Sequence, residues 1–245
     1  VGSEMCIRDR YIQRFSGRVV LIKIGGSTLV DQRLFDRLAE DVVLLHSVGI
    51  KPIIVHGGGP QIEAELKNRK IKDSEYQGLR VTSESILKIV KNILSKKLNK
   101  KISLELNKFG RIAKRVDGMS LKVIEAKIAL NGNIGYVGEP TKLDKKTINK
   151  IITNKKVPII APIGYTRNGT CLNINADTAA AFIAETLKAE RLLLLTDVEG
   201  VLNNNKKLIF SSISDKNCGS RDAIEIDTGE YLQYLPSIAP ATVPE

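Results

Sequence analysis

The sequence predicts an α/β protein in which a mostly parallel β-sheet is covered by helices. Two observations predict this fold class. Short apolar runs rich in β-branched residues alternate along the chain with segments whose apolar residues recur every three or four positions. Several apolar runs also end directly in glycine or polar turns, and no internal repeat or linker interrupts the series. We therefore expect one domain built around a parallel sheet.

The first strand–helix–strand unit lies near the start of the chain. Residues 18–24 (RVVLIKI) form an apolar run that ends at a glycine pair, and residues 34–48 have the apolar spacing of a helix. Residues 51–56 (KPIIVH) form a second short buried strand, which three glycines and a helix-like segment follow. This order predicts parallel strands joined by a right-handed crossover.

A long amphipathic helix is predicted over residues 83–106. Its lysines could form a stripe for nucleic acid, but no aromatic residue is interleaved with them. A solvated helix face is therefore the preferred interpretation.

Hairpins interrupt the parallel pattern in the second half of the chain. Apolar and polar residues alternate with a period of two in the segment IEAKIAL, and Asn131 and Gly132 supply a two-residue turn. The segment NIGYVGEP then forms the returning strand of the hairpin. A second hairpin is predicted around residues 167–170. Hairpins inserted into such a chain commonly cover a site. The parallel pattern then resumes with a strand over 157–161, an alanine-rich helix over 176–189 and a strand over 191–197.

Composition excludes several classes of protein. The chain has 245 residues, is 42% hydrophobic and 27% charged, and contains no apolar run near the roughly 20 residues of a membrane helix. Its three cysteines are far apart and form no disulfide framework or zinc motif, which favours a reducing cytoplasm. The net charge of +11 favours anionic ligands. With only 4% aromatic residues, stacking side chains for single-stranded nucleic acid are scarce.

The two ends differ from the middle. Residues 1–10 (VGSEMCIRDR) resemble translated sequencing-adapter read-through more than a protein segment. Residues 218–245 carry one arginine against five acidic residues and no lysine. An ordinary acidic, proline-containing arm is the alternative for this tail. We expect the domain itself to occupy residues 11–217.

Apart from Arg18 at its start, Lys23 is the one charged residue of the first predicted strand, and it stands just before Gly25 and Gly26. A glycine turn at the carboxyl end of a parallel strand lets backbone N–H groups approach an anion, and an ammonium adds a point charge. These residues outline a phosphate site. A lysine at an edge strand, facing water beside a tight turn, is an equally good interpretation of the strand and turn alone.

The second strand ends in His56 and three glycines, of which Gly57 and Gly58 come first. Bare amides and the N-terminus of the following helix suit a carboxylate or a phosphate. The spacing matches neither the Rossmann nor the Walker fingerprint. We expect His56 to be a packed residue, or one that supports a neighbouring site residue, rather than a catalyst, because no motif places a Ser or Cys nucleophile beside it.

Five further polar residues flank predicted strands and helices. Arg80 could clamp a carboxylate with its planar guanidinium, although taken alone it is better interpreted as a surface arginine. Asn175 is a plausible helix N-cap and Asp177 a first-turn acid, so the start of the helix accounts for both residues. It does not account for Asn173, which therefore favours a binding site at this position. Asp197 ends a buried strand, at the sheet edge where ligands usually bind; an ordinary strand-to-turn aspartate is the alternative.

Five motifs, in the order LIKIGGS, VHGGGPQI, GLRVT, LNINADTAA and LLLLTDVEGVL, closely resemble those of the N-acetylglutamate kinases in the amino-acid kinase family. The likeness runs from about Tyr11 to Asn217. It implies a three-layer αβα sandwich whose N-terminal half binds N-acetyl-L-glutamate and whose C-terminal half binds ATP with Mg²⁺. The implied activity is phosphorylation of the side-chain carboxylate, the second step of arginine biosynthesis, in the cytoplasm.

The resemblance also implies catalytic and nucleotide-binding roles. Lys23 would stabilise the transferring phosphoryl group, and Asp177 would organise the catalytic lysines. Gly25, Gly26 and the loop from Asp197 would face the nucleotide. No set of residues for a protein-bound metal is expected.

The substrate would be held by four residues on the matching positions. Gly57 and Gly58 would present amides to acetylglutamate, Arg80 would clamp a carboxylate, and Asn173 would hold the substrate. Because the nucleophile is an ionised carboxylate, no general base is needed, which fits the absence of a poised histidine.

The resemblance further implies a homo-oligomer, a dimer or a hexamer, because residues 11–18 look like the extra N-terminal helix of a family subset linked to arginine feedback. A PII-type signalling protein is a possible partner; nucleic acid and membranes are not expected. The family continues with a second catalytic lysine that residues 218–245 do not match. A truncated or chimeric chain with impaired activity is therefore expected. A regulatory protein that binds acetylglutamate or arginine, or another member of the family, is the alternative.

Overall fold

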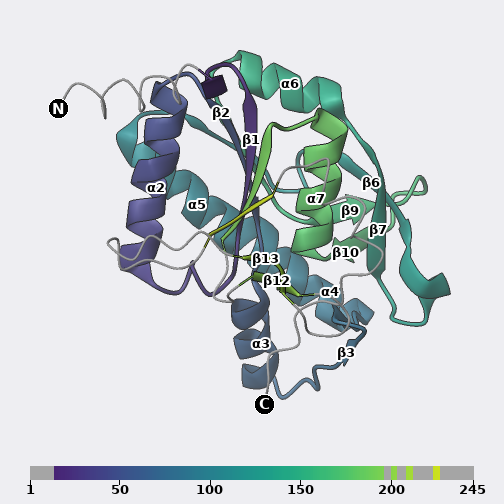
Figure 1. Ribbon diagram of the computed structural model, residues 1–245. Helices are drawn as coiled ribbons and strands as arrows, with labels where there is room; N and C mark the ends of the chain where they lie inside the picture. The colour runs from purple at the N-terminus through teal and green to yellow at the C-terminus, as the bar shows by residue number, and fades with distance from the viewer. Residues whose placement is uncertain (1–13, 196–199, 203–207, 212–222, 227–245) are drawn as a thin grey trace, which may run out of the picture.

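The computed structural model describes residues 14–195, 200–202, 208–211 and 223–226. A six-stranded sheet forms its centre, in the order β14-β11-β1-β2-β8-β5. Figure 1 shows β1 and β2 in the middle of this sheet. The strands are β1 (Val19–Ile24), β2 (Lys51–His56), β5 (Ala113–Val116), β8 (Val157–Ile160), β11 (Arg191–Leu195) and β14 (Ala223–Ile226). All neighbouring pairs are parallel except β11 and β14. The predicted mostly parallel sheet is confirmed.

Helices cover both faces of this sheet. Alternate residues of β1 point to opposite faces, so Val20 and Ile22 pack on one side and Leu21 on the other. The first face is covered by α2 (Gln32–Ser47), α3 (Gly59–Asn68) and the long helix that begins at Glu84. The second is covered by α6 (Lys145–Thr153) and α7 (Ala176–Leu187). The arrangement is a three-layer αβα sandwich, as expected.

The long helix has a widened middle. It consists of α4 (Glu84–Lys91), a π-helical segment η1 (Asn92–Leu98) and α5 (Asn99–Leu106), and a short 3₁₀ turn η2 (Asn107–Phe109) follows. The apolar spacing predicts one helix over 83–106, and its extent is confirmed. The π-helical segment is not predictable from that spacing. Ser95 in this segment and Asn99 just after it are both buried. Ser95 bonds to Asp117, just after β5, and Asn99 bonds to Ile159 of β8.

Two hairpins close into a small barrel beside the main sheet. Its strands are β6 (Ile124–Ile128), β7 (Val137–Leu143), β9 (Ile163–Tyr165) and β10 (Cys171–Ile174), arranged in the order β10-β7-β6-β9. β6 pairs antiparallel with β7, and β9 with β10, which confirms both predicted hairpins.

The predicted two-residue turn in the first of these hairpins is wrong. Ile128 pairs with Gly138, so the connection is longer and includes the 3₁₀ segment η3 (Ala129–Gly132). Its left-handed residues include Asn131, as the turn chemistry predicts, but also Leu130. The connection is longer because tertiary contacts hold it. Backbone bonds from Thr82 N to Ile134 O and from Tyr136 N to Thr82 O tie the connection to the segment before α4.

Short strands complete the description. β3 (Glu75–Tyr76) pairs with β4 (Leu79–Arg80) between α3 and α4. β12 (Gly200–Leu202) pairs with β13 (Leu208–Ser211). Within the described ranges no helix is long and apolar enough to cross a membrane.

Candidate active site

A cleft of about 460 Å³ opens where three central strands end together. Ile24 of β1 pairs with His56 of β2 on one side and with Leu195 of β11 on the other. The C-terminal ends of these strands therefore meet at one edge of the sheet. Eight of the nine predicted site residues line this cleft: Lys23, Gly25, Gly26, Gly57, Gly58, Arg80, Asn173 and Asp177. Asp197, the ninth, lies outside the described residues.

Lys23 and Asp177 form an ion pair in the cleft. Lys23 extends from β1, and its Nζ lies 2.9 Å from Oδ1 of Asp177 in the first turn of α7. Asn175 caps this helix, because its side chain accepts hydrogen bonds from the backbone N–H groups of Asp177 and Thr178. The N-terminus of α7 thus faces the cleft with its positive dipole end, beside one lysine ammonium.

Two glycine turns pack directly against each other. The N–H of Gly57 donates to the carbonyl of Ile24 over 2.8 Å, which continues the pairing of β1 with β2 by one residue. A Cβ on Gly26 would lie 2.7 Å from Cδ of Pro60 and 3.1 Å from the backbone N of Gly59. Glycine is therefore required at position 26 by the close approach of the second turn.

Arg80 is buried and doubly paired. Its side chain is 9% exposed, contacts Asp73 through Nη1, and lies 3.1 Å from Glu63 through Nη2. The interpretation as a surface arginine is therefore wrong. That interpretation rested on Arg80 alone, whereas the fold places the guanidinium of Arg80, on β4, between the carboxylates of Asp73 and Glu63.

Asn173 reaches the cleft from the barrel. It lies on β10, and its Nδ2 donates to the hydroxyl of the fully buried Thr82 over 3.2 Å. The hairpins thus bring a polar side chain to the edge of the parallel sheet. This placement is in keeping with the expectation that they cover a site.

His56 is fully buried, which confirms that it is a packed residue. Burial is the largest cause that lowers the pKa of its imidazole, to about 4, and the hydrogen bond with the carbonyl of Gly57 opposes this only in part. The ring is therefore neutral near pH 7.

Sequence reasoning missed Glu63, Asp73 and Gln61. Gln61 Nε2 donates to the carbonyl of Gly26 over 2.7 Å, while its Oε1 is buried without a partner in the described part of the chain. Gln61 stands just after the glycines in the first turn of α3, and this position is a signal that could have identified it. Glu63 and Asp73 carry no such local signal, because only the tertiary fold brings them to Arg80.

The amino acid kinase family matches residues 18–237, which extends past the expected boundary at Asn217. An acetylglutamate kinase from Caldanaerobacter subterraneus subsp. tengcongensis is 46% identical over 195 residues, which cover 79% of this chain and 65% of that protein. One from Pelagibacter ubique is 43% identical over 226 residues, which cover 92% of this chain and 77% of that protein.

Solved structures share the fold. The protein smu.665 from Streptococcus mutans matches with a TM-score of 0.68 and 31% identity, over 76% of this chain and 75% of that one. An N-acetylglutamate synthase from Neisseria gonorrhoeae matches with a TM-score of 0.70 and 22% identity, over 82% of this chain and 46% of that one, and shows the fold alone. The chain belongs to the amino acid kinase family and is related to the acetylglutamate kinases.

Proposed function

We propose that this chain uses ATP to phosphorylate the side-chain carboxylate of N-acetyl-L-glutamate, the second step of arginine biosynthesis. The observation that carries the proposal is the cleft, which joins the Lys23–Asp177 pair to Arg80 and Asn173 through two glycine turns. The names of the related acetylglutamate kinases support the choice of substrate. The first of these relatives is covered over only 65% of its own length.

Phosphoryl transfer to a carboxylate requires that the reacting groups be aligned and that the negative charge of the phosphoryl oxygens be neutralised. The substrate carboxylate is ionised at neutral pH and can attack without a general base. Lys23 stabilises the negative charge of the transferring phosphoryl oxygens, and Asp177 holds the lysine ammonium in place. Arg80 binds a second carboxylate of the substrate, and Asn173 offers an amide to its polar groups.

The amides of the glycine turns lie between these two ends of the cleft. Backbone N–H groups at a helix N-terminus suit an anion, and glycine lets it approach closely. Gly57 and Gly58 therefore contact acetylglutamate, while Gly25 and Gly26 face the phosphates of the nucleotide. Asp197 faces the nucleotide in the same proposal.

Mg²⁺ arrives with the nucleotide, whose phosphates supply most of its ligands. In the described ranges no group of three or more His, Cys, Asp or Glu side chains could hold a metal. The described residues alone therefore do not form a metal site, and we assign them no step through Mg²⁺. A dimer or hexamer, a PII-type partner and a cytoplasmic location remain predictions from the resemblance.

The test couples ADP release to a visible readout with N-acetylglutamate, glutamate, aspartate, UMP and carbamate as acceptors. We expect turnover with N-acetylglutamate alone, at the reduced rate that the sequence predicts for this chain, and calorimetric binding of N-acetylglutamate in the absence of nucleotide. Preference for another acceptor would overturn the assignment of N-acetylglutamate as the substrate. Binding of N-acetylglutamate without turnover would identify a regulatory binding protein instead. The absence of binding would exclude both the kinase and the regulatory binding protein.

A further inference from the structure

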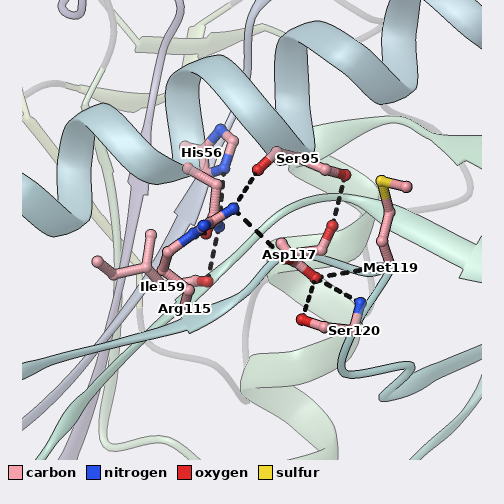
Figure 2. Close-up of polar contacts among 8 residues, drawn as sticks. His56, Ser95, Arg115, Asp117, Met119, Ser120 and Ile159 are labelled. Atoms are coloured by element: carbon pink, nitrogen blue, oxygen red, sulfur yellow. Dashed lines mark hydrogen bonds and ion pairs between the residues drawn. The ribbon is translucent and has the colours of Figure 1, made fainter.

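His56 directly precedes the glycine turn that lines the cleft, and it bonds through both of its ring nitrogens. Nδ1 lies 3.1 Å from the carbonyl oxygen of Gly57, and Nε2 lies 3.3 Å from Nδ2 of Asn99. Asn99 is also fully buried and stands at the first position of α5, immediately after the π-helical segment. Figure 2 shows the ring of His56 at one end of a connected set of polar contacts. The proposed chemistry assigns no task to either residue.

The orientation of the Asn99 amide is fixed by two other contacts. Nδ2 donates to the carbonyl of Ile159 over 2.8 Å, and Oδ1 accepts from Nε of Arg115 over 3.1 Å. A flipped amide would place oxygen against the carbonyl of Ile159 and nitrogen against the guanidinium, so it is excluded. The group that faces His56 is therefore a donor.

This orientation fixes the tautomer of the imidazole. Nε2 accepts from Asn99 and so carries no proton, which leaves the proton of the neutral ring on Nδ1. Burial keeps the ring uncharged by lowering its pKa to about 4, so the doubly protonated form is not populated near pH 7. Nδ1–H therefore donates to the carbonyl of Gly57.

The fixed carbonyl determines where the next amide points. In a planar trans peptide the C=O and the following N–H point in opposite directions. With its carbonyl directed at His56, the peptide from Gly57 to Gly58 turns the Gly58 N–H away from the ring, and both glycines line the cleft. Among the described residues no backbone group accepts from this N–H.

We propose that His56, oriented by Asn99, is a positioning residue that keeps the Gly58 N–H directed into the cleft as a donor to an anionic group of the substrate. The substrate part of this inference depends on the proposed function.

Packing on the other side of the turn supports the same fixed geometry. A Cβ on Gly58 would lie 2.7 Å from both Leu94 Cδ2 and Leu98 Cδ1, so the π-helical segment closes directly over this glycine. Further polar contacts hold the segment itself. Nη2 of Arg115 donates to the carbonyl of Ser95 over 2.7 Å, and Ser95 Oγ donates to the carbonyl of Asp117 (Figure 2).

The contacts continue into β5 and the loop after it. Nη2 of Arg115 lies 3.3 Å from Oδ2 of Asp117, whose Oδ1 accepts from the backbone N–H groups of Met119 and Ser120. The turn beside the substrate is thereby connected to the central sheet rather than held by local backbone bonds alone. Such prior organisation of amide donors favours anion binding because no reorganisation is needed when the anion arrives.

The experiment compares His56→Asn with His56→Leu in the full chain. The carboxamide of Asn can place an NH₂ where Nδ1–H stands, whereas Leu has similar bulk and no donor. We expect His56→Leu to weaken calorimetric binding of N-acetylglutamate by about tenfold, and His56→Asn to restore it to within about threefold of the wild type. Circular dichroism verifies that both variants are folded.

A second measurement needs no variant and no substrate. In the wild type, ¹⁵N–¹H correlation of the imidazole at pH 7 should show the His56 proton on Nδ1. A proton on Nε2, or a charged ring, would overturn the inference, as would unchanged binding by a folded His56→Leu. Failure of the wild type to bind N-acetylglutamate would instead count against the proposed function, and the position of the ring proton would still decide the role of His56.

Discussion

The Nζ atom of Lys23 lies 2.9 Å from a carboxylate oxygen of Asp177, an ion pair that joins the end of β1 to the first turn of α7. The lysine side chain is 13% exposed and the aspartate side chain 47% exposed. The ammonium is thus mostly enclosed but keeps an acidic partner that water still reaches. A cation in this position, beside a helix N-terminus, can neutralise charge on a phosphoryl group.

Replacing Lys23 by Met should lower kcat by about 10²-fold to 10³-fold and leave the Kd for N-acetylglutamate within about threefold, because the lost charge acts on the transferring group. Asp177→Asn should lower kcat less, by about tenfold, because the ammonium remains but loses its fixed partner. Coupled kinetics and calorimetry measure the two quantities separately.

Glu185→Gln is the matched control for Asp177→Asn, since it makes the same acid-to-amide change at an exposed position of the same helix. It should leave both kcat and binding unchanged. Equal losses in kcat for the two variants would show that the charge of the helix, rather than the ion pair, is responsible.

Much of the fold could be predicted because local signals agree with the tertiary structure. Apolar runs identify the central strands, and the ends of parallel strands gather at one edge, so the Lys23 and Gly57 turns could be expected to meet. The burial of Arg80 could not be predicted, because Glu63 and Asp73 reach it only through the folding of β3 and β4. The π-helical segment likewise has no signature in the apolar spacing, which a regular helix satisfies equally well.

If Arg80 binds a carboxylate of the substrate, as proposed, Glu63 competes with that carboxylate for the guanidinium. Its side chain is 58% exposed and lies 3.1 Å from Nη2, so the pair is weakened by water. Glu63→Gln should therefore improve the affinity for N-acetylglutamate modestly, by about twofold to fivefold, with a smaller salt dependence. Arg80→Lys should weaken the affinity by about tenfold or more because the planar fork is lost.

Glu65→Gln supplies the control for Glu63→Gln, because Glu65 lies on the same helix but pairs with Arg69. Calorimetry at two salt concentrations should show no change in substrate affinity for Glu65→Gln. A fall in affinity with Glu63→Gln would mean that Glu63 orients Arg80 for the substrate rather than competing with it.

The contact between the two glycine turns can be tested with alanine. Gly26→Ala should lower the free energy of unfolding by about 1–3 kcal/mol, because the added methyl meets the rigid ring of Pro60 and backbone that cannot move independently. Gly59→Ala should stay within about 0.5 kcal/mol of the wild type, since its Cβ would meet only Glu63 Oε1 at 3.7 Å. Urea denaturation of both variants checks the difference, and equal losses would contradict the close contact.

Stability should fall on acidification because of His56. Its folded-state pKa of about 4 lies below the ordinary value of 6.5, mainly because the ring is fully buried. Below the ordinary value the unfolded chain binds a proton that the folded chain does not, so the contribution is complete above that value and is lost as the pH falls towards the folded-state pKa. Between about pH 7 and pH 4 the free energy of unfolding should fall by about 3 kcal/mol more in the wild type than in His56→Asn, which has no ring to protonate.

Urea denaturation at a series of pH values measures this difference. The control is His46→Asn, which makes the same substitution at the other histidine of the chain, half-buried in the last turn of α2. This variant should retain the extra acid sensitivity that His56→Asn loses, because His56 is still present. If the wild type and His56→Asn lost stability in parallel from neutral pH to pH 4, the buried neutral imidazole would be ruled out, and with it the ring tautomer that directs Gly57.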